Sequence, residues 1–150
     1  MTVTEAFNLT THGGAKDFAT LVAVVDSFGP WCLIGGLAVN CYADPVYTLD
    51  LNLVVRGDAF VPPTAPESDL RIQFTTDPRY QDFPGRSLPG TVLGVRVRIA
   101  TLEDVTQGKL WAYADPRRRF SKRKKDELDL IRLAEAYPRL NPSTPLNSAT

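Results

Sequence analysis

The chain has 150 residues, of which 43% are hydrophobic and 23% charged, and its 17 basic and 17 acidic side chains give a formal net charge of zero. This composition is typical of one globular domain with its own core and excludes wholesale disorder. Because the net charge is zero, attraction to nucleic acid or to an anionic membrane can only be local. No apolar run approaches the roughly 18–20 residues of a membrane span, and no secretion signal is recognised, so we expect a cytoplasmic protein.

The first half of the chain alternates helical and strand patterns. Residues 1–13 are polar and unpatterned, and we expect them to form a flexible lead-in. Apolar spacing and Gly/Pro breaks then predict, in chain order, a helix over 15–28, a buried strand over 31–34, a short helix over 37–43 and a strand over 48–55.

The second half begins with a segment, 56–68, that is too rich in proline to form a useful helix. The elements expected after it are strands over 70–75 and 92–100, a helix over 101–114 capped by Thr101, and a last helix that starts at Asp115-Pro116 and ends near Tyr137. The order predicts an α/β (α+β) fold, with a small mixed sheet flanked by helices. We place the domain at 14–138 and a flexible tail at 139–150.

The most informative pattern is Gly35-Gly36 followed by Asp50 and Asn52 on one strand. A Gly-Gly turn between a strand and a helix leaves backbone N–H groups near a positive helix end, which suits a phosphate. Oxygen ligands at i and i+2 of a strand project to the same side, where Mg²⁺ could bridge them to that phosphate. The pattern therefore predicts a nucleotide and metal site.

These stretches resemble the nucleotidyltransferase (DNA polymerase beta-like) superfamily, in particular its AbiEii/MNT-type bacterial branch. The resemblance rests on Ile34-Gly35-Gly36-Leu37-Ala38 and on Pro45-x-Tyr47-Thr48-Leu49-Asp50-Leu51-Asn52-Leu53-Val54-Val55. Gly108-Lys109-Leu110-Trp111-Ala112 and the charged run 119–130 are similar to the closing helices of that branch. The resemblance covers about residues 15–138 and implies a nucleotidyltransferase-like fold. The cofactor-binding residues that it implies are Gly35, Gly36 and Lys109.

The resemblance implies transfer of a nucleoside monophosphate from an NTP to a hydroxyl group, with Mg²⁺ held by three carboxylates. Asp50 matches the first carboxylate and metal ligand, but the second catalytic position holds Asn52 and the third holds Gln73. If the third ligand lay on the strand 92–100, the candidates would be Arg96 and Arg98, which are cations. Loss of two of three charges is expected to cost on the order of a thousandfold in rate.

Two functions remain open at this point. The first is a catalytically impaired module that binds a nucleotide, RNA or a protein partner, such as a toxin or antitoxin, and that needs no metal. The second is an active Mg²⁺-dependent enzyme that transfers NMP from NTP to protein or RNA in a toxin–antitoxin or phage-defence system. The second requires another carboxylate, such as Asp44, Asp58 or Asp77, to reach Asp50.

The segment 117–125 is the only concentrated charge in the chain, with seven basic residues in nine positions. It predicts contact with RNA or DNA phosphates, with Phe120 available for stacking. The nucleic-acid residues on this interpretation are Arg118, Arg119, Lys122 and Arg123. The alternative is a solvated helix face with ion pairs Lys122–Asp126 and Lys125–Asp129. Asp126 and Asp129 could also bind a metal, but the nearby lysines favour ion pairing.

Several of these residues have plainer interpretations. Asp50 could be a lone strand aspartate that pairs with a lysine, and Asn52 and Gln73 could hydrogen-bond each other across adjacent strands. Cys32 and Cys41 lie in apolar segments and are expected to be buried free thiols. His12 is not expected to act in acid–base chemistry, and Trp31 and Trp111 are expected in the core.

Overall fold

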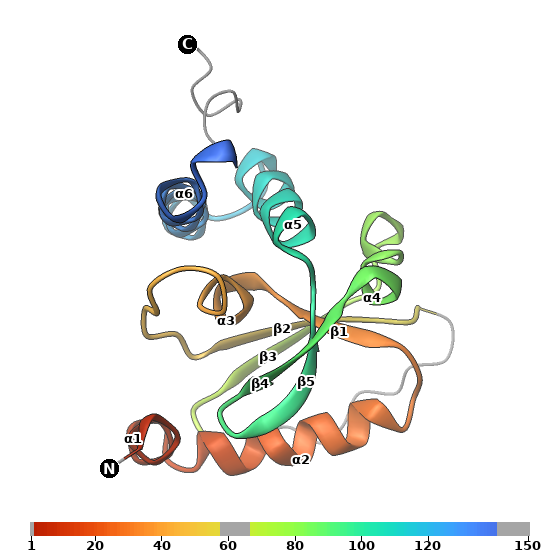
Figure 1. Cartoon of the computed structure of the whole chain (residues 1–150), viewed down its shortest axis with the longest axis vertical. Coiled ribbons are helices and arrows are strands. Elements are labelled where there is room, and N and C mark those ends of the chain that lie inside the picture. The colour runs from red at the N-terminus through yellow and green to blue at the C-terminus, as the bar shows by residue number, and fades with distance from the viewer. Residues whose placement is uncertain (1, 58–66, 141–150) are drawn as a thin grey trace.

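The computed structural model describes residues 2–57 and 67–140. They form a five-stranded mixed sheet with helices on both faces (Figure 1). The strands are β1 (Trp31–Ile34), β2 (Asp50–Val55), β3 (Arg71–Thr75), β4 (Leu88–Val92) and β5 (Val95–Ile99). The α-helices are α1 (Val3–Thr10), α2 (Gly14–Asp26), α3 (Gly35–Val39), α4 (Phe83–Arg86), α5 (Leu102–Ala114) and α6 (Phe120–Ala136). The predicted α/β class with a mixed sheet is therefore confirmed.

The strand order is β3-β2-β1-β5-β4. Strands β2 and β3 are parallel, as are β1 and β5, whereas β1–β2 and β4–β5 are antiparallel. Helix α2 lies on one face of the sheet, and α5 and α6 lie beyond the other (Figure 1). None of the described helices is long and apolar enough to span a membrane.

The core forms where the predicted helical and strand patterns face each other. The apolar stripe of α2 is buried as its spacing predicts, through Phe18, Leu21, Val22 and Val25. In β2 the side chains of Leu51 and Leu53 are buried, while Asp50 and Asn52 on the opposite face are only half-buried. Over residues 50–53 the alternation of β2 thus separates a core face from a polar face, whereas Val54 and Val55 at the end of the strand are both buried.

The N-terminal segment differs from the expected lead-in. Helix α1 begins at the N-cap Thr2, whose side chain accepts the Glu5 N–H while the Glu5 carboxylate accepts the Thr2 N–H. This reciprocal capping box starts a helix of only eight residues. Phe7 then packs against the core, and His12 forms a 2.6 Å contact with Asp69. Residues 3–10 are therefore helical, whereas the sequence pattern predicts no regular structure there.

The strand expected over 92–100 is confirmed only from Val95 to Ile99, as β5, and its first residues belong to a β-hairpin with β4. Leu93 and Gly94 both have positive φ values, 50° and 78°, and they connect β4 to β5 as a two-residue turn. Such left-handed turns match the twist of the flanking strands. The segment before residue 92, where the sequence pattern predicts no strand, thus supplies β4.

The last helix also begins later than expected. The Asp115 carboxylate accepts the Arg117 N–H, and the Asp115 carbonyl accepts the Arg118 N–H, so residues 115–118 form a turn. Helix α6 begins only at Phe120. The expected cap of α5 is confirmed, because the Thr101 side chain accepts the Asp104 N–H at 3.1 Å.

Cys32 and Trp31 are buried, as expected, whereas Trp111 is partly buried and packs against the core. Cys41 is exposed, which corrects the expectation of a buried thiol. Helix α3 ends at Val39, so Cys41 lies in the turn that follows it rather than on a helix face toward the core. Most of the expected tail, residues 141–150, lies outside the described residues.

Candidate functional site

Four polar side chains share one face of the sheet where β2 and β3 begin. The parallel register pairs Asp50 with Arg71 and Asn52 with Gln73. Because side chains alternate between the two faces of a strand, all four project to the same side. Helices α5 and α6 lie beyond that side (Figure 1). The structure therefore brings the three catalytic positions predicted from the sequence together, and it adds a cation to them.

The Gly35-Gly36 turn is shaped by Asn52. Gly35 has a φ of +75°, and a Cβ at this position would lie 2.4 Å from Nδ2 of Asn52. A Cβ on Gly36 would lie 3.7 Å from Oγ1 of Thr48, which is ordinary contact. Gly35 is thus needed both for its left-handed backbone and for the close approach of Asn52.

Asn52 and Gln73 leave their amide groups open. They are paired in register, but within the described part of the chain their side chains make no hydrogen bond to each other. Both line the cavity between the sheet and the helices. Their amides are therefore polar groups available to a ligand in that cavity.

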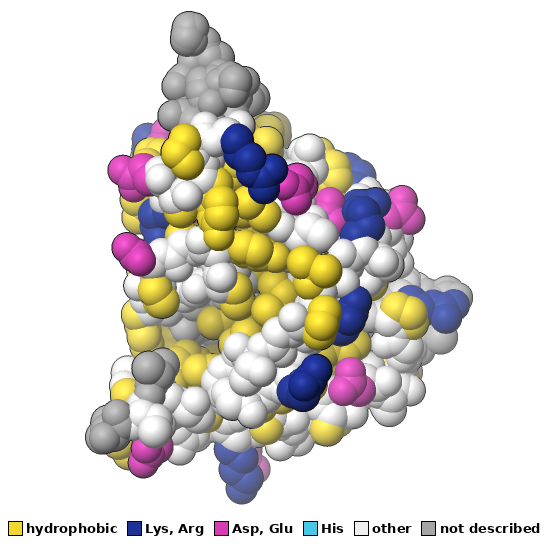
Figure 2. Space-filling view, in the orientation of Figure 1, with side chains coloured by type: hydrophobic (Ala, Val, Ile, Leu, Met, Phe, Trp, Pro, Cys, Tyr) yellow, Lys and Arg dark blue, Asp and Glu magenta, His cyan; other side chains and the backbone are white. Residues whose placement is uncertain are grey.

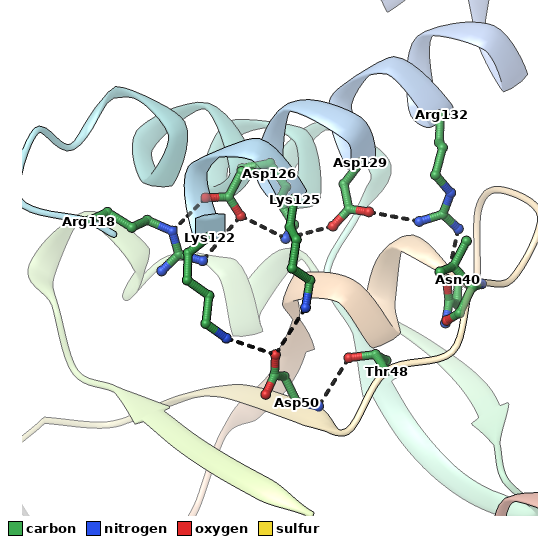
Figure 3. A network of polar contacts seen from close by, with 11 residues as sticks. Asn40, Thr48, Asp50, Arg118, Lys122, Lys125, Asp126, Asp129 and Arg132 are labelled. Carbon is green, nitrogen blue, oxygen red and sulfur yellow. Dashed lines mark hydrogen bonds and ion pairs between the residues drawn. The ribbon is translucent and has the colours of Figure 1, made fainter. Parts of the chain in front are cut away.

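Asp50 is surrounded by three cations. Its Oδ1 accepts a hydrogen bond from Nε of Arg71 at 2.6 Å, and its Oδ2 lies 3.2 Å from Nζ of Lys122 and 3.5 Å from Nζ of Lys125. The two lysines reach down from α6 to the start of β2 (Figure 3). Partial burial opposes ionisation, but the hydrogen bonds from Arg71 and Lys122 outweigh it and lower the pKa of Asp50 to about 2. Asp50 is therefore an anion whose two oxygens are bound by cations, as its plainer interpretation predicts.

A second charged network lies between α5 and α6. The Asp126 side chain is only 1% exposed, and its Oδ1 accepts a hydrogen bond from Nζ of Lys109 at 3.1 Å. Its Oδ2 lies 2.5 Å from Nε of Arg118, and Lys109 also contacts Oδ2 of Asp129 at 2.8 Å. We call Lys109, Arg118, Asp126, Asp129 and Arg132 the buried network. It joins the two closing helices through ion pairs that are largely withdrawn from water.

Arg132 extends the buried network to α3. It pairs with Oδ1 of Asp129 at 2.8 Å and donates to Oδ1 of Asn40 at 3.0 Å (Figure 3). It also donates to the backbone carbonyl of Asp44. Asn40 in turn donates to the carbonyl of Val46 at 2.7 Å. The loop that leads into β2 is thereby fixed against α6.

The expected ion pairs Lys122–Asp126 and Lys125–Asp129 are wrong. The two acids face α5 and bind Lys109, whereas the two lysines face the sheet and bind Asp50 (Figure 3). Sequence spacing along one helix cannot predict these pairings, because it does not show which charged residues of β2 and α5 pack beside the helix. Asp126 and Asp129 do form ion pairs, as expected, but with Lys109, Arg118 and Arg132.

Three of the four predicted nucleic-acid residues are engaged inside the protein. Arg118 binds Asp126, Lys122 binds Asp50, and Arg123 donates to the carbonyl of Tyr113 at 3.1 Å. Arg119 is exposed, and its side chain makes no hydrogen bond or ion pair within the described residues. Internal pairing thus takes up much of the charge that the segment 117–125 could offer to a nucleic acid.

Two adjoining cavities open between the sheet and α5–α6. One has a volume of about 440 Å³ and the other about 80 Å³. They share the side chains of Asn52, Gln73, Lys109, Arg118 and Asp126. We call the pair the charged cleft. The larger cavity is within the size range of small-molecule sites, and its apolar lining includes Ile34, Phe74, Tyr80, Val105 and Ala112.

A third cavity of about 600 Å³ is apolar and lies beside α1, α3 and the β4–β5 hairpin. None of the described residues that line it is charged; they include Phe7, Leu37, Val46, Tyr47 and Leu93. Figure 2 shows apolar side chains gathered across the middle of this face of the molecule. Because no charged side chain lines this third cavity, it has fewer groups that could bind an ionic ligand or take part in catalysis than the charged cleft.

The residues at the start of β2 do not fit a magnesium ion. Magnesium prefers anionic oxygen ligands in octahedral geometry. Here the only carboxylate of the three predicted positions, Asp50, is bound by Arg71, Lys122 and Lys125, and Asn52 and Gln73 are neutral. A metal ion would have to displace those cations or share their space.

Of the carboxylates considered as substitutes, the two that the structure describes, Asp44 and Asp77, do not line the cavities beside Asp50. Asp77 pairs with Arg79 at 3.1 Å, and Asp58 lies outside the described residues. Asp44 has its backbone carbonyl on Arg132. Within the described ranges no group of three histidine, cysteine, aspartate or glutamate side chains is placed to hold a metal.

Sequence reasoning missed Arg71 and Lys125 as partners of Asp50. Arg71 reaches it only because β3 pairs in parallel with β2, and Lys125 only because α6 crosses above the start of β2. The alternation of polar and apolar residues over 70–75, which places Arg71 and Gln73 on one face, was the one available signal for Arg71. A scan against models of known protein families finds no match, and neither does a search of curated proteins.

Proposed function

We propose that the protein is a nucleotidyltransferase-like module that binds a nucleotide in the charged cleft and does not carry out Mg²⁺-dependent transfer. The observation that carries the proposal is the surrounding of Asp50 by three cations, with Asn52 and Gln73 neutral beside it. In a transferase of this type the same place would have to attract two dications. In this protein the cations around Asp50 instead favour binding of an anionic ligand without a metal ion.

The lining of the cleft supports a ligand with two chemically different ends. The larger cavity offers an apolar wall with the half-buried ring of Tyr80, which suits a nucleobase or another flat group. The smaller cavity adjoins it and carries Lys122 and Lys125, which suit phosphate oxygens. Asn52 and Gln73 lie in both cavities and can hydrogen-bond the portion between the two ends.

On this proposal the protein is a binding or regulatory module of the cytoplasm. An RNA or a toxin–antitoxin partner would bind in addition to the nucleotide. The enzyme alternative would need Mg²⁺ to displace Lys122 and Lys125 from Asp50. The described residues contain no group of three histidine, cysteine, aspartate or glutamate side chains that could hold this ion. We therefore favour the binding module.

Calorimetric titration of ATP and of GTP into the protein, once with excess EDTA and once with Mg²⁺, tests the proposal. We expect binding in EDTA that does not strengthen when Mg²⁺ is added, because the cations that meet the phosphates belong to the protein. Tyr80→Ala should weaken the binding by removing the apolar wall. Leu128→Ala, at an exposed position that lines neither cavity of the charged cleft, serves as the control.

Two outcomes would sink the proposal. Absence of binding to either nucleotide would exclude a nucleotide module. Binding that appears only with Mg²⁺, together with NMP transfer that Asp50→Ala abolishes, would establish the enzyme alternative.

A further inference from the structure

We propose that Lys122 and Lys125 form a phosphate site that Asp50 occupies when no ligand is bound, so that this carboxylate is a built-in competitor of the ligand. The inference rests on the function proposed above and deepens it by giving Asp50 a role in regulating the same site. The ligand class is a phosphate or diphosphate group carried on a small molecule.

The two oxygens of Asp50 have different partners. Oδ1 binds Arg71, its neighbour across the β2–β3 pair, at 2.6 Å. Oδ2 faces the helix and is shared by Lys122 at 3.2 Å and Lys125 at 3.5 Å. A carboxylate oxygen held between two ammonium groups has the charge and the hydrogen-bond geometry of a phosphate oxygen. Oδ2 therefore stands where an oxygen of the ligand would be.

Lys122 and Lys125 are the cations of the cleft that can exchange partners. Lys109, Arg118 and Arg132 bind carboxylates of the buried network, and removing them would leave those charges uncompensated. In the described part of the chain, both lysines form an ion pair with Asp50, and the side chains of Lys122 and Lys125 are 32% and 57% exposed. Their long flexible side chains can turn to a ligand at little cost.

Space and charge for the ligand lie next to this pair. The smaller cavity is lined by Asp50 and both lysines and has a volume of about 80 Å³, room for about two or three waters. Five cationic and three anionic side chains line it, which gives it a net charge of +2. An arriving phosphate would thus meet excess positive charge even while Asp50 remains ionised.

The exchange needs no covalent step. The phosphate takes the lysine ammonium groups from Oδ2, while Oδ1 stays on Arg71 and holds the carboxylate at the edge of the sheet. The remaining negative charge of Asp50 opposes the phosphate at short range, so it lowers affinity and speeds release. A metal ligand at this position would have the opposite effect, because removing it would weaken phosphate binding.

The sign of the Asp50→Asn effect separates the two roles. We would titrate inorganic pyrophosphate into the wild type, Asp50→Asn and the double variant Lys122→Gln/Lys125→Gln, all in EDTA at low salt. Removing one unit charge from the site should tighten binding by on the order of tenfold. The double variant should lose binding by at least as much. Lys124→Gln, on the same helix but paired with Glu127, should bind like the wild type.

An Asp50→Asn protein that binds pyrophosphate equally or more weakly would overturn the inference, as would a double variant with unchanged affinity. Circular dichroism checks that each variant is folded, and Asp50→Ser provides a second neutral side chain if the asparagine variant is not. Repeating the series with ADP distinguishes the two proposals. Tight pyrophosphate binding without ADP binding would end the nucleotide proposal alone, whereas ADP binding that Asp50→Asn does not strengthen would end the competitor role alone.

Discussion

Asp50 and Asp126 are two carboxylates that each bind more than one cation, and they differ in their access to water. The Asp126 side chain is 1% exposed, and its partners Lys109 and Arg118 are 10% and 33% exposed. The Asp50 side chain is 19% exposed, and its partners from α6 and β3 are exposed by 32% to 60%. One cluster is closed between two helices, and the other opens into a cavity.

The difference separates stability from binding. A buried ion pair that loses one partner leaves an uncompensated charge in a medium of low polarity. A half-exposed pair is screened by water and contributes little to stability, but its charges can be transferred to a ligand. We therefore assign the buried network to holding α5 and α6 together and the Asp50 cluster to ligand binding.

The largest expected effect comes from breaking the closed cluster. Asp126→Ala leaves Lys109 and Arg118 without their shared buried partner and should lower the free energy of unfolding by about 3–5 kcal/mol. Urea denaturation measures it. Glu135→Ala, on an exposed position of the same helix, is the matched control and should change stability by less than about 0.5 kcal/mol. Equal effects of the two substitutions would contradict the assignment.

A substitution of Gly35, which lines the larger cavity of the charged cleft, should have the next largest effect. Gly35→Ala forces a φ of +75° on alanine and drives its Cβ into Asn52, so we expect a loss of about 1–3 kcal/mol. Asn52→Ala in the same chain should restore only the part due to the clash. Gly36→Ala, with ordinary room, should be neutral or stabilising by up to about 1 kcal/mol. Thermal unfolding compares the four proteins, and equal losses at both glycines would refute this explanation.

Asp50→Asn should have a much smaller effect on stability than Asp126→Ala. Its three partners reach water, so we expect a change of about 1 kcal/mol or less at neutral pH. The same urea experiment measures it. A loss as large as that of Asp126→Ala would mean that the open cluster is a structural element, and the comparison between the two would fail.

The smallest effect is the pH dependence of that contribution. The folded pKa of Asp50 is about 2, below its ordinary value of 3.8, because Arg71 and Lys122 favour the anion over the opposing effect of burial. Its stabilisation is therefore complete above about pH 4 and is lost as the pH falls through 2. The stability difference between the wild type and Asp50→Asn should shrink over that interval. A carboxyl carbon titration by NMR that gives Asp50 a pKa near 4 would contradict the cation cluster.

Local patterns in the sequence were sufficient for most of the fold. The stripe of α2, the apolar run of β1 and the alternation of β2 each depend on neighbours along the chain. The missed elements depended on subtler local signals. The Thr2–Glu5 capping box marks α1, and Gly94 marks the hairpin turn, but α1 and β4 are short elements of eight and five residues, so few positions carry their patterns.

The site was only partly predictable, for a physical reason. The face of β2 that carries Asp50 and Asn52 follows from alternation alone, and the match of Gln73 to Asn52 follows once β3 is paired with β2. The partners of each charge do not follow. Lys122 could bind Asp126 one turn away or Asp50 on a distant strand, and only the packing of α6 over the sheet decides between them.

The central claim is that protein cations, rather than a metal, neutralise Asp50. Adding Mn²⁺ to the isotopically labelled protein tests it directly, because this paramagnetic ion takes oxygen ligands as Mg²⁺ does and broadens the NMR signals of nuclei near its binding site. We predict no selective broadening of the backbone signals of Asp50, Asn52 and Gln73. Selective broadening of these three signals that disappears in Asp50→Asn would show a working metal site and contradict the account.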